Sequence, residues 1–249
     1  MTTPSMFMLE IFLCLVGAHI LAACGNGQTA ITQAQKQQID QLARFADSLQ
    51  PQASWNFDFE KLPAGQTPIG WTPYFTGEGN TDWKISRDNE NQVLAQLYSD
   101  NPGSHFNIIV NDSISAKDLK LSIKLKGVGG KHDQGGGLVW RFIDKNNHYI
   151  VRANPLEDNV VLYKMEKGKR IDLPLVGLGK TYGMQTEPLG KAWNTLSLTV
   201  KGEWFTVFLN GKELFKVQDQ TFSDPGKVGF WTKADAVTYF DDFEVGKFE

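Results

Sequence analysis

Cysteine is nearly absent from this chain, which has two in 249 residues, Cys14 and Cys24. Cys14 lies in an apolar stretch that we expect to be removed, so the mature protein would keep Cys24 alone. An exported chain with a single cysteine cannot form an internal disulfide. Its stability must come from the burial of apolar side chains, and about 225 residues are enough for one large core.

A large excess of positive or of negative charge is also absent. The 25 Lys and Arg residues face 28 Asp and Glu residues, the net charge is −3, and the two signs are mixed along the chain. Without a basic stripe to follow phosphates, we expect no nucleic-acid partner. Without a polybasic segment, we expect no direct binding to anionic lipid.

The apolar run 11–22, IFLCLVGAHILA, is too short for a permanent membrane-spanning helix, which needs about 20 apolar residues. It ends in small residues, and this pattern predicts a secretory signal peptide over residues 1–23. The segment Leu21-Ala22-Ala23-Cys24 resembles a bacterial lipobox. The resemblance implies that Cys24 is lipidated and that the lipid anchors an exported protein to the cell envelope, as a periplasmic or cell-surface protein.

The charge of this segment departs from the usual pattern of a signal peptide. No Lys or Arg occurs before Lys36, and Glu10 lies where positive charge is usual. An ordinary signal peptide, or a misplaced start codon, therefore remains an alternative to the lipoprotein signal.

Residues 24–52 are expected to form a tether. Within 31–50, apolar side chains recur near one helical stripe, which predicts a short amphipathic helix. We favour packing of this helix on the following domain, because Phe45 and Leu49 would be costly to leave in water. A stalk or a partner-binding helix is the alternative.

From Trp55 onward, short β-rich segments alternate with turns. Residues 195–200 alternate cleanly between polar and apolar side chains, and Asn210-Gly211 suits a type I′ hairpin turn. The number and spacing of these segments predict an all-β sandwich. The expected strands are 55–59, 82–86, 92–98, 105–110, 117–126, 136–143, 148–154, 159–165, 194–201, 203–209, 212–217, 226–232 and 237–246.

Residues 174–191, PLVGLGKTYGMQTEPLGK, break this rhythm with glycine and proline. They predict a long loop, and long loops in compact domains are often functional. No internal repeat or low-complexity tract is evident.

Residues 135–164 predict a β-ribbon with two different faces. If its turn pairs Ile143 with His148, alternation gives one apolar face, which suits a core and carries Leu138, Trp140, Phe142, Tyr149, Val151 and Ala153. The other face would carry Arg141, Arg152 and Asn154 among apolar residues. Two guanidinium groups and an amide on one rigid sheet indicate recognition of a polar ligand. Structural ion pairs with Asp or Glu across the sheet are the alternative for both arginines.

The strand motifs resemble a laminin G-like or concanavalin A-like jelly roll, over roughly residues 55–247. The segments that carry the resemblance are 136–141, 146–152, 193–195, 207–212, 226–230 and 240–243. Among such proteins the chain is most similar to bacterial exported proteins related to 3-keto-disaccharide hydrolase-type domains. The resemblance implies a two-sheet antiparallel jelly roll over residues 53–249, and it leaves the activity open.

Catalytic motifs of those relatives are missing. The Glu-x-Asp-x-x-Glu strand of family 16 glycoside hydrolases does not occur, nor do the Tyr-Glu-x-Gln segment and the His-Gly of keto-disaccharide hydrolases. An enzyme is therefore unsupported, although Asp235, Glu157 or Asp133 could serve as an acid or base.

Metal ligands are sparse in the sequence. His132-Asp133 has no second histidine at ligand spacing, and a solvated turn is the favoured interpretation. The resemblance implies one possible Ca²⁺ between the first and last strands, where Asp241 or Asp242 would act with Asp58 or Glu60 as hard oxygen ligands. Acceptance of hydrogen bonds from a turn is the alternative role for Asp242.

Sugars present flat apolar patches beside pairs of hydroxyl groups, so a sugar-binding protein combines an aromatic platform with planar donors and amides. We therefore expect the sandwich to bind a carbohydrate or a similar polar ligand without cleaving it. The alternatives are a glycoside-processing hydrolase and a structural or adhesion module of the cell envelope. The expected ligand-binding residues are Arg141, Arg152, Asn154, Asn159, Trp231, Lys233 and Asp235.

Overall fold

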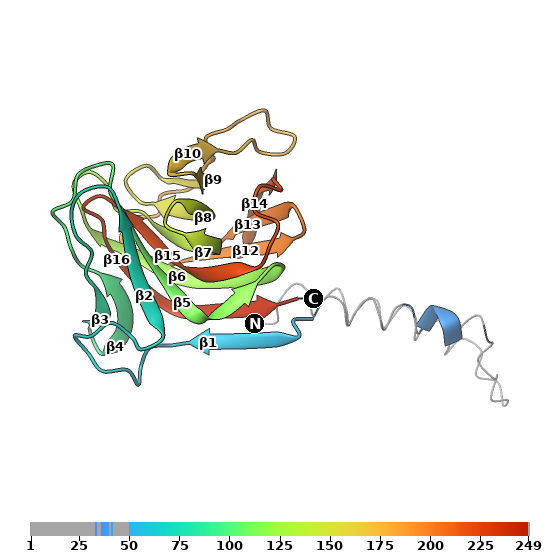
Figure 1. Ribbon diagram of the computed structural model, residues 1–249, viewed down its shortest axis with the longest axis horizontal. Helices are drawn as coiled ribbons and strands as arrows, with labels where there is room; N and C mark the ends of the chain where they lie inside the picture. Colours follow the sequence, from blue (N-terminus) through green and yellow to red (C-terminus); the bar gives the residue numbers. More distant parts are fainter. Residues whose placement is uncertain (1–32, 34–35, 40, 42–49, 249) are drawn as a thin grey trace. The chain divides into compact units, whose positions relative to one another are not determined.

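The computed structural model describes residues 33, 36–39, 41 and 50–248 (Figure 1). The chain divides into two units, residues 1–49 and 50–249, which we describe separately. In the first unit, the described residues of the expected amphipathic helix are helical. The expected signal peptide and Cys24, the expected site of lipidation, lie outside the described residues. No described helix is long and apolar enough to cross a membrane.

Residues 50–248 form two antiparallel eight-stranded sheets. The first, sheet A, contains β14 (Lys212–Gln218), β13 (Trp204–Leu209), β12 (Asn194–Lys201), β6 (Leu119–Gly129), β16 (Val237–Lys247), β4 (Asn91–Gln96) and β3 (Trp83–Asp88), in that spatial order, with β1 (Ala53–Phe57) beside β16.

The second, sheet B, contains β10 (Lys169–Asp172), β9 (Asn159–Glu166), β8 (Asn147–Asn154), β7 (Gly136–Asp144), β15 (Gly226–Lys233), β5 (Phe106–Ala116) and β2 (Trp71–Thr76), in that order, with β11 (Met184–Gln185) beside β9. The two sheets make the two-layer jelly-roll sandwich that the sequence predicts.

The main core lies between the sheets and follows the period-2 pattern of the strands. In β6, Leu119, Leu121, Ile123 and Leu125 are buried, while the residues between them are exposed or half-buried. These four side chains belong to one apolar cluster with residues from both sheets, including Trp140. Alternation of this kind places one face of each sheet in the core.

Three strands were not expected from the sequence: β2, β10 and β11. β2 contains Pro73, and proline cannot donate a ladder hydrogen bond. The structure places β2 at the end of sheet B, where among the described strands it pairs with β5 alone. An edge strand tolerates proline because one side of its ladder is free.

The predicted phase of the 135–164 ribbon is wrong at Arg141. The register between β7 and β8 shifts between Trp140 and Asp144, and Arg141 has a positive φ of 46°, as expected of a β-bulge. An extra residue in one strand reverses the faces beyond it. Phe142, expected in the main core, therefore lies on the opposite face of sheet B.

Arg141 consequently points into the sandwich and does not share a face with Arg152. Its guanidinium carbon lies 5.6 Å from the ring centre of Phe205, a residue of the main core, and the side chain is 1% exposed. Its three nitrogens donate hydrogen bonds to the backbone oxygens of Lys117 (3.1 Å), Phe222 (2.7 Å) and Gly202 (2.6 Å). Arg141 is therefore a structural residue, because a ligand cannot reach it.

A second apolar cluster fills the other face of sheet B. It contains Phe106 from β5, Trp231 from β15 and Tyr163 from β9. The rings of Phe106 and Tyr163 are 6.5 Å apart, although β15, β7 and β8 lie between their strands. Four strand spacings of a flat sheet would separate them by roughly 19 Å. Sheet B is therefore strongly curled, and Figure 1 shows it turning from β5 and β15 towards β8, β9 and β10. We call this face the concave face.

Candidate functional site

Arg152 is the centre of a polar cluster at the end of the concave face. β8 places it opposite Val161 of β9, on the same side as the concave apolar cluster. One terminal nitrogen donates to Asn159 Oδ1, and the other donates to Glu157 Oε2 (2.8 Å) and Tyr182 OH (3.0 Å). The Arg152 side chain is buried, whereas the Glu157 side chain is 40% exposed. We call Arg152, Glu157, Asn159, Arg170 and Tyr182 the Arg152 cluster.

Tyr182 presents an aromatic surface to solvent and is 50% exposed. The guanidinium carbons of Arg152 and Arg170 lie 6.0 and 5.6 Å from its ring centre. Tyr182 OH also donates to Glu157 Oε2 at 3.2 Å. Two planar cations and two hydrogen bonds of its hydroxyl group thus fix the orientation of the ring.

Arg170 enters this cluster from β10. Its Nε donates to Asp172 Oδ1 at 2.9 Å, and its guanidinium carbon lies 4.0 Å from the ring centre of Tyr163. Sequence reasoning missed both Arg170 and Tyr182. Arg170 lies in a strand too short for its pattern to be recognised. Tyr182 lies in the 174–191 segment that was predicted to be a functional loop.

The turn between β8 and β9 brings Glu157 and Asn159 to the cluster. Asn154 and Asn159 pair directly across the two strands, and Asn154 Oδ1 accepts a hydrogen bond from the Leu156 N–H (3.0 Å). Burial opposes ionisation of Glu157, but the charge of Arg152 and hydrogen bonds from Arg152, Asn159 and Tyr182 outweigh it, so the Glu157 pKa is lowered. Glu157 is therefore an ionised acceptor that is open to solvent.

Asp133, Asn154 and Lys233 form an adjoining group. Asp133 Oδ1 accepts hydrogen bonds from Gly135 N–H (2.7 Å) and Asn154 Nδ2 (3.3 Å), and Asp133 Oδ2 lies 3.6 Å from Lys233 Nζ. Burial raises the Asp133 pKa, and the Gly135 N–H and the charges of Arg152 and Lys233 offset this only in part. Lys233 is partly exposed, whereas Asn154 is fully buried and uses its amide to hold the Asp133 carboxylate.

Asp235 holds a loop and does not face a ligand. Its carboxylate accepts hydrogen bonds from the backbone N–H groups of Lys131 (2.6 Å), His132 (3.1 Å) and Asp133 (3.0 Å). Burial opposes ionisation, but these donors outweigh it and lower the Asp235 pKa. The prediction that Asp235 contacts a ligand is not supported by this arrangement, since the three backbone donors orient its oxygens towards the loop.

Trp231 lies on the concave face, on the side where the sequence placed it, but beneath the surface. It is fully buried, and its ring centre is 5.3 Å from that of Phe106 and 5.9 Å from that of Tyr163. In this arrangement Trp231 belongs to the floor of the concave face and is not an exposed platform. Tyr182 takes the exposed position.

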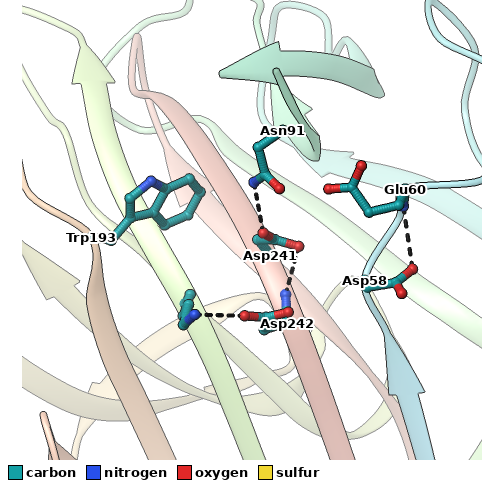
Figure 2. Close-up of a pocket in the computed structure, with 7 residues that line it drawn as sticks. Asp58, Glu60, Asn91, Trp193, Asp241 and Asp242 are labelled. Carbon is teal, nitrogen blue, oxygen red and sulfur yellow. Dashed lines mark hydrogen bonds and ion pairs between the residues drawn. The ribbon is translucent and has the colours of Figure 1, made fainter. Parts of the chain in front are cut away.

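Asp241 and Asp242 lie in a separate hollow of about 290 Å³ on sheet A. Figure 2 shows Asp241 between Asn91 and Asp242, with Trp193 on one side and Glu60 and Asp58 on the other. The acidic residues that the resemblance brought together do therefore line one hollow. The lining residues are Asp58, Glu60, Asn91, Lys124, Trp193, Asp241 and Asp242.

The groups in this hollow do not fit a preformed Ca²⁺ site, which needs six to eight free oxygen ligands. Asp241 accepts hydrogen bonds from Asn91 Nδ2 (2.8 Å) and from the Asp242 N–H (2.7 Å). Lys124 Nζ lies 2.6 Å from Asp242 Oδ2, and this contact raises the Lys124 pKa. In the described part of the chain, no three or more His, Cys, Asp or Glu side chains are grouped to hold a metal.

Comparison with known proteins gives a fold and no family. No protein-family model matches the sequence, and no curated protein matches it. Among solved structures, the chain is similar to the carbohydrate-binding module CBM66 from Bacillus subtilis, with a TM-score of 0.55 and 21% identity over 74% of this chain and 98% of that one. A putative glycosyl hydrolase from Parabacteroides distasonis aligns with a TM-score of 0.45 and 17% identity, over 78% and 98% of the two chains. The first of these likenesses confirms the predicted fold, a two-sheet jelly-roll sandwich.

Proposed function

We propose that this chain is an exported carbohydrate-binding protein that holds a neutral sugar against Tyr182 and Glu157. The half-exposed Tyr182 ring, fixed over the guanidinium groups of Arg152 and Arg170, carries this proposal. A fixed aromatic ring offers an apolar surface to the flat face of a sugar at little cost in conformational entropy. The exposed carboxylate of Glu157 beside it accepts hydrogen bonds from sugar hydroxyl groups.

The charges around the Arg152 cluster favour a neutral ligand. Arg152 pairs with Glu157 at 2.8 Å, Arg170 with Asp172 at 2.8 Å, and Lys233 faces Asp133 at 3.6 Å. Each cation already has an anionic partner, so a charged ligand would gain little long-range attraction. A polyhydroxylated ligand instead makes directed hydrogen bonds with both members of such pairs.

The fold supports a binding role by analogy alone. The Bacillus subtilis structure to which the chain is similar is named a carbohydrate-binding module, and it shares the two-sheet sandwich. Jelly rolls serve many functions, so the Arg152 cluster itself carries the proposed binding role.

Direct titration of a glycan panel tests the proposal. We expect the protein to bind at least one neutral glycan, and Tyr182→Ala to weaken that binding by about tenfold or more, which is 1.4 kcal/mol. Trp204→Ala is the matched control, because Trp204 is 44% exposed and belongs to β13 of sheet A. Equal affinities of wild type and Tyr182→Ala, or the same loss in Trp204→Ala, would show that the Arg152 cluster is not the binding site.

Cleavage of the ligand is the less supported alternative. Burial raises the pKa of Asp133 while Arg152 helps to lower that of Glu157, and such a difference is what an acid and a base require. Asp133, however, is 2% exposed and bound to Gly135 and Asn154. In this arrangement a glycosidic bond cannot reach its carboxyl group, so we propose binding without hydrolysis.

The lipid anchor on Cys24 remains part of the proposal. It rests on the Leu21-Ala22-Ala23-Cys24 segment, which follows an apolar run. Expression in a bacterial host should give a protein in the membrane fraction that incorporates labelled fatty acid. Cys24→Ser should abolish the labelling, and an unlabelled wild type would rule the anchor out.

A further inference from the structure

Two polar atoms beneath Tyr182 are buried without a partner. Tyr163 OH and Trp231 Nε1 belong to fully buried side chains, and neither has a hydrogen-bond partner among the residues that the structure describes. Both groups would be hydrogen-bonded to water in the unfolded chain. Folding that leaves them unpaired costs free energy, so a buried polar atom of this kind needs an explanation.

The two side chains lie at the end of a series of contacts that begins at the surface. Tyr182 is half-exposed, and Arg170 lies beneath its ring at 5.6 Å. The guanidinium of Arg170 lies 4.0 Å from the ring centre of Tyr163, whose ring centre is 5.9 Å from that of Trp231. The series therefore leads from solvent, through Tyr182 and Arg170, to the two side chains that carry the unpaired atoms.

Side chains, and not strands, form the cover of this region. Tyr182 belongs to the segment between β10 and β11, where Gly177 and Gly179 have positive φ values of 74° and 62°. Leu175 of the same segment is buried and bridges Val217 of β14, but the following Val176 and Leu178 have exposed side chains, so few apolar contacts hold the tip beyond Leu175. Rotation of the Tyr182 and Arg170 side chains would uncover the region at the cost of the Tyr182 hydrogen bonds to Arg152 and Glu157, but without breaking a pairing of sheet B. The ring that is fixed in the closed state is in this way displaced only when the inner region opens.

The side opposite the cover is closed. Phe106 packs on both Trp231 and Tyr163, at 5.3 and 6.5 Å, and the curled sheet continues beneath these rings. A polymer therefore could not pass through this region if Tyr182 and Arg170 moved aside, and a ligand that entered it would do so with one end.

From these observations we infer that Tyr163 and Trp231 form the floor of an inner subsite, covered by Tyr182 and Arg170, which takes the terminal unit of a glycan. The inference rests on the proposed function and specifies its ligand as a chain end. Trp231 Nε1 is a donor only, and Tyr163 OH both donates and accepts. The terminal sugar offers a hydroxyl or ring oxygen to both groups, and Tyr182 stacks on the unit outside.

Removal of one oxygen atom, that of the Tyr163 hydroxyl group, tests the floor of the inner subsite. Tyr163→Phe removes the hydroxyl and keeps the ring, so we expect about fivefold to tenfold weaker binding of the panel glycan, with an unchanged or higher Tm. Tyr239→Phe on β16 is the control and should change neither quantity. Equal affinity of Tyr163→Phe and wild type for the same glycan would overturn the inner subsite and leave the outer site in place.

Hydrogen exchange tests the opening in the free protein, independently of any glycan. The indole N–H of Trp140 is also fully buried and without a partner in the described structure, but it lies in the main core. If Tyr182 and Arg170 open, the Trp231 indole N–H exchanges at least about tenfold faster than that of Trp140 at equal intrinsic rates. Equal exchange of the two indoles would overturn the inference. A glycan panel without any ligand, together with fast Trp231 exchange, would instead defeat only the carbohydrate assignment.

Discussion

At the scale of the residue, His148 makes the stability of the fold depend on pH. Burial lowers its pKa to about 4, against 6.5 in a model peptide, and the Asp144 backbone oxygen that binds its Nδ1 offsets this only in part. The unfolded chain gains a proton on this residue below pH 6.5, whereas the folded chain gains it only near pH 4. Stability is therefore lost as pH falls through this window.

We expect the free energy of unfolding to decrease by up to ~3 kcal/mol between pH 7 and pH 4 because of His148. His148→Phe should make the curve flatter over this range, as measured by urea denaturation at each pH. His132→Gln is the control, because His132 is exposed in its loop. A pH dependence that is identical in wild type and His148→Phe would contradict the assignment.

In the hollow of Figure 2, the ammonium group of Lys124 already pairs with Asp242, as a bound metal ion would. We therefore expect the Tm of the wild type to be the same in EDTA and in millimolar Ca²⁺. Lys124→Met leaves Asp241 and Asp242 without their cation, and Ca²⁺ should then stabilise the protein by on the order of 1 kcal/mol at about ten times its Kd. Lys120→Met, on the same strand, should show no such response. Stabilisation of the wild type by Ca²⁺ would contradict this interpretation.

At the scale of the element, the bulge in β7 depends on Arg141. Its guanidinium satisfies three backbone oxygens at once, and a shorter or apolar side chain leaves them unpaired. Arg141→Met should lower the free energy of unfolding by about 3 kcal/mol, and Arg141→Lys should not restore it, because an ammonium group lacks the planar fork. Denaturant titration measures both.

The exposed Arg87 provides the control for this change, and Arg87→Ala should alter stability by less than about 0.5 kcal/mol. A loss below about 1 kcal/mol in Arg141→Met would show that the bulge is held by its neighbours instead.

The same bulge marks the limit of prediction from sequence. Strict alternation correctly placed Trp140 in the core and Arg152 on the concave face, because each lies on the regular side of the irregularity. No residue pattern in the sequence indicates that Arg141 has a positive φ, so the face of sheet B on which it lies could not be predicted. β2 was missed for a related reason, since Pro73 is compatible with a strand only at a sheet edge, and edges are known only from the assembled sheet.

The candidate site was predicted in part. Arg152, Asn159 and Lys233 lie at the concave end, and Trp231 lies beneath them. Tyr182 joins them through contacts between segments 30 residues apart, which periodicity cannot reveal. The signal that did exist was the length and composition of the 174–191 loop, which indicated function without indicating a residue.

At the scale of the whole molecule, the jelly roll was predictable because its strands are short, regular and separated by turn residues. The main-core residues that the structure describes, from Phe59 to Val245, all belong to the unit 50–249. We therefore expect residues 50–249 alone to fold with a Tm within about 3 °C of the mature chain, a shift of about 1 kcal/mol, and to bind the same glycans. Calorimetry and titration of both proteins measure this.

A larger loss of Tm in the shortened protein would contradict that expectation. It would support the interpretation that the sequence favours, in which the 31–50 helix packs on the domain and contributes Phe45 and Leu49 to its stability.

The contacts over the concave face come from separate segments of the chain. Trp231 and Lys233 belong to a central strand of a sheet, whereas Tyr182 belongs to the connection between β10 and β11. The start of that connection is anchored, because Leu173 and Leu175 lie in the main core and Leu175 bridges Val217 of β14. Exchanging residues 177–182, which follow this anchored part, for a loop of another sequence would therefore change the outer contacts while the framework is conserved. Related chains can in this way diversify their specificity through one short insertion point, at little risk to folding.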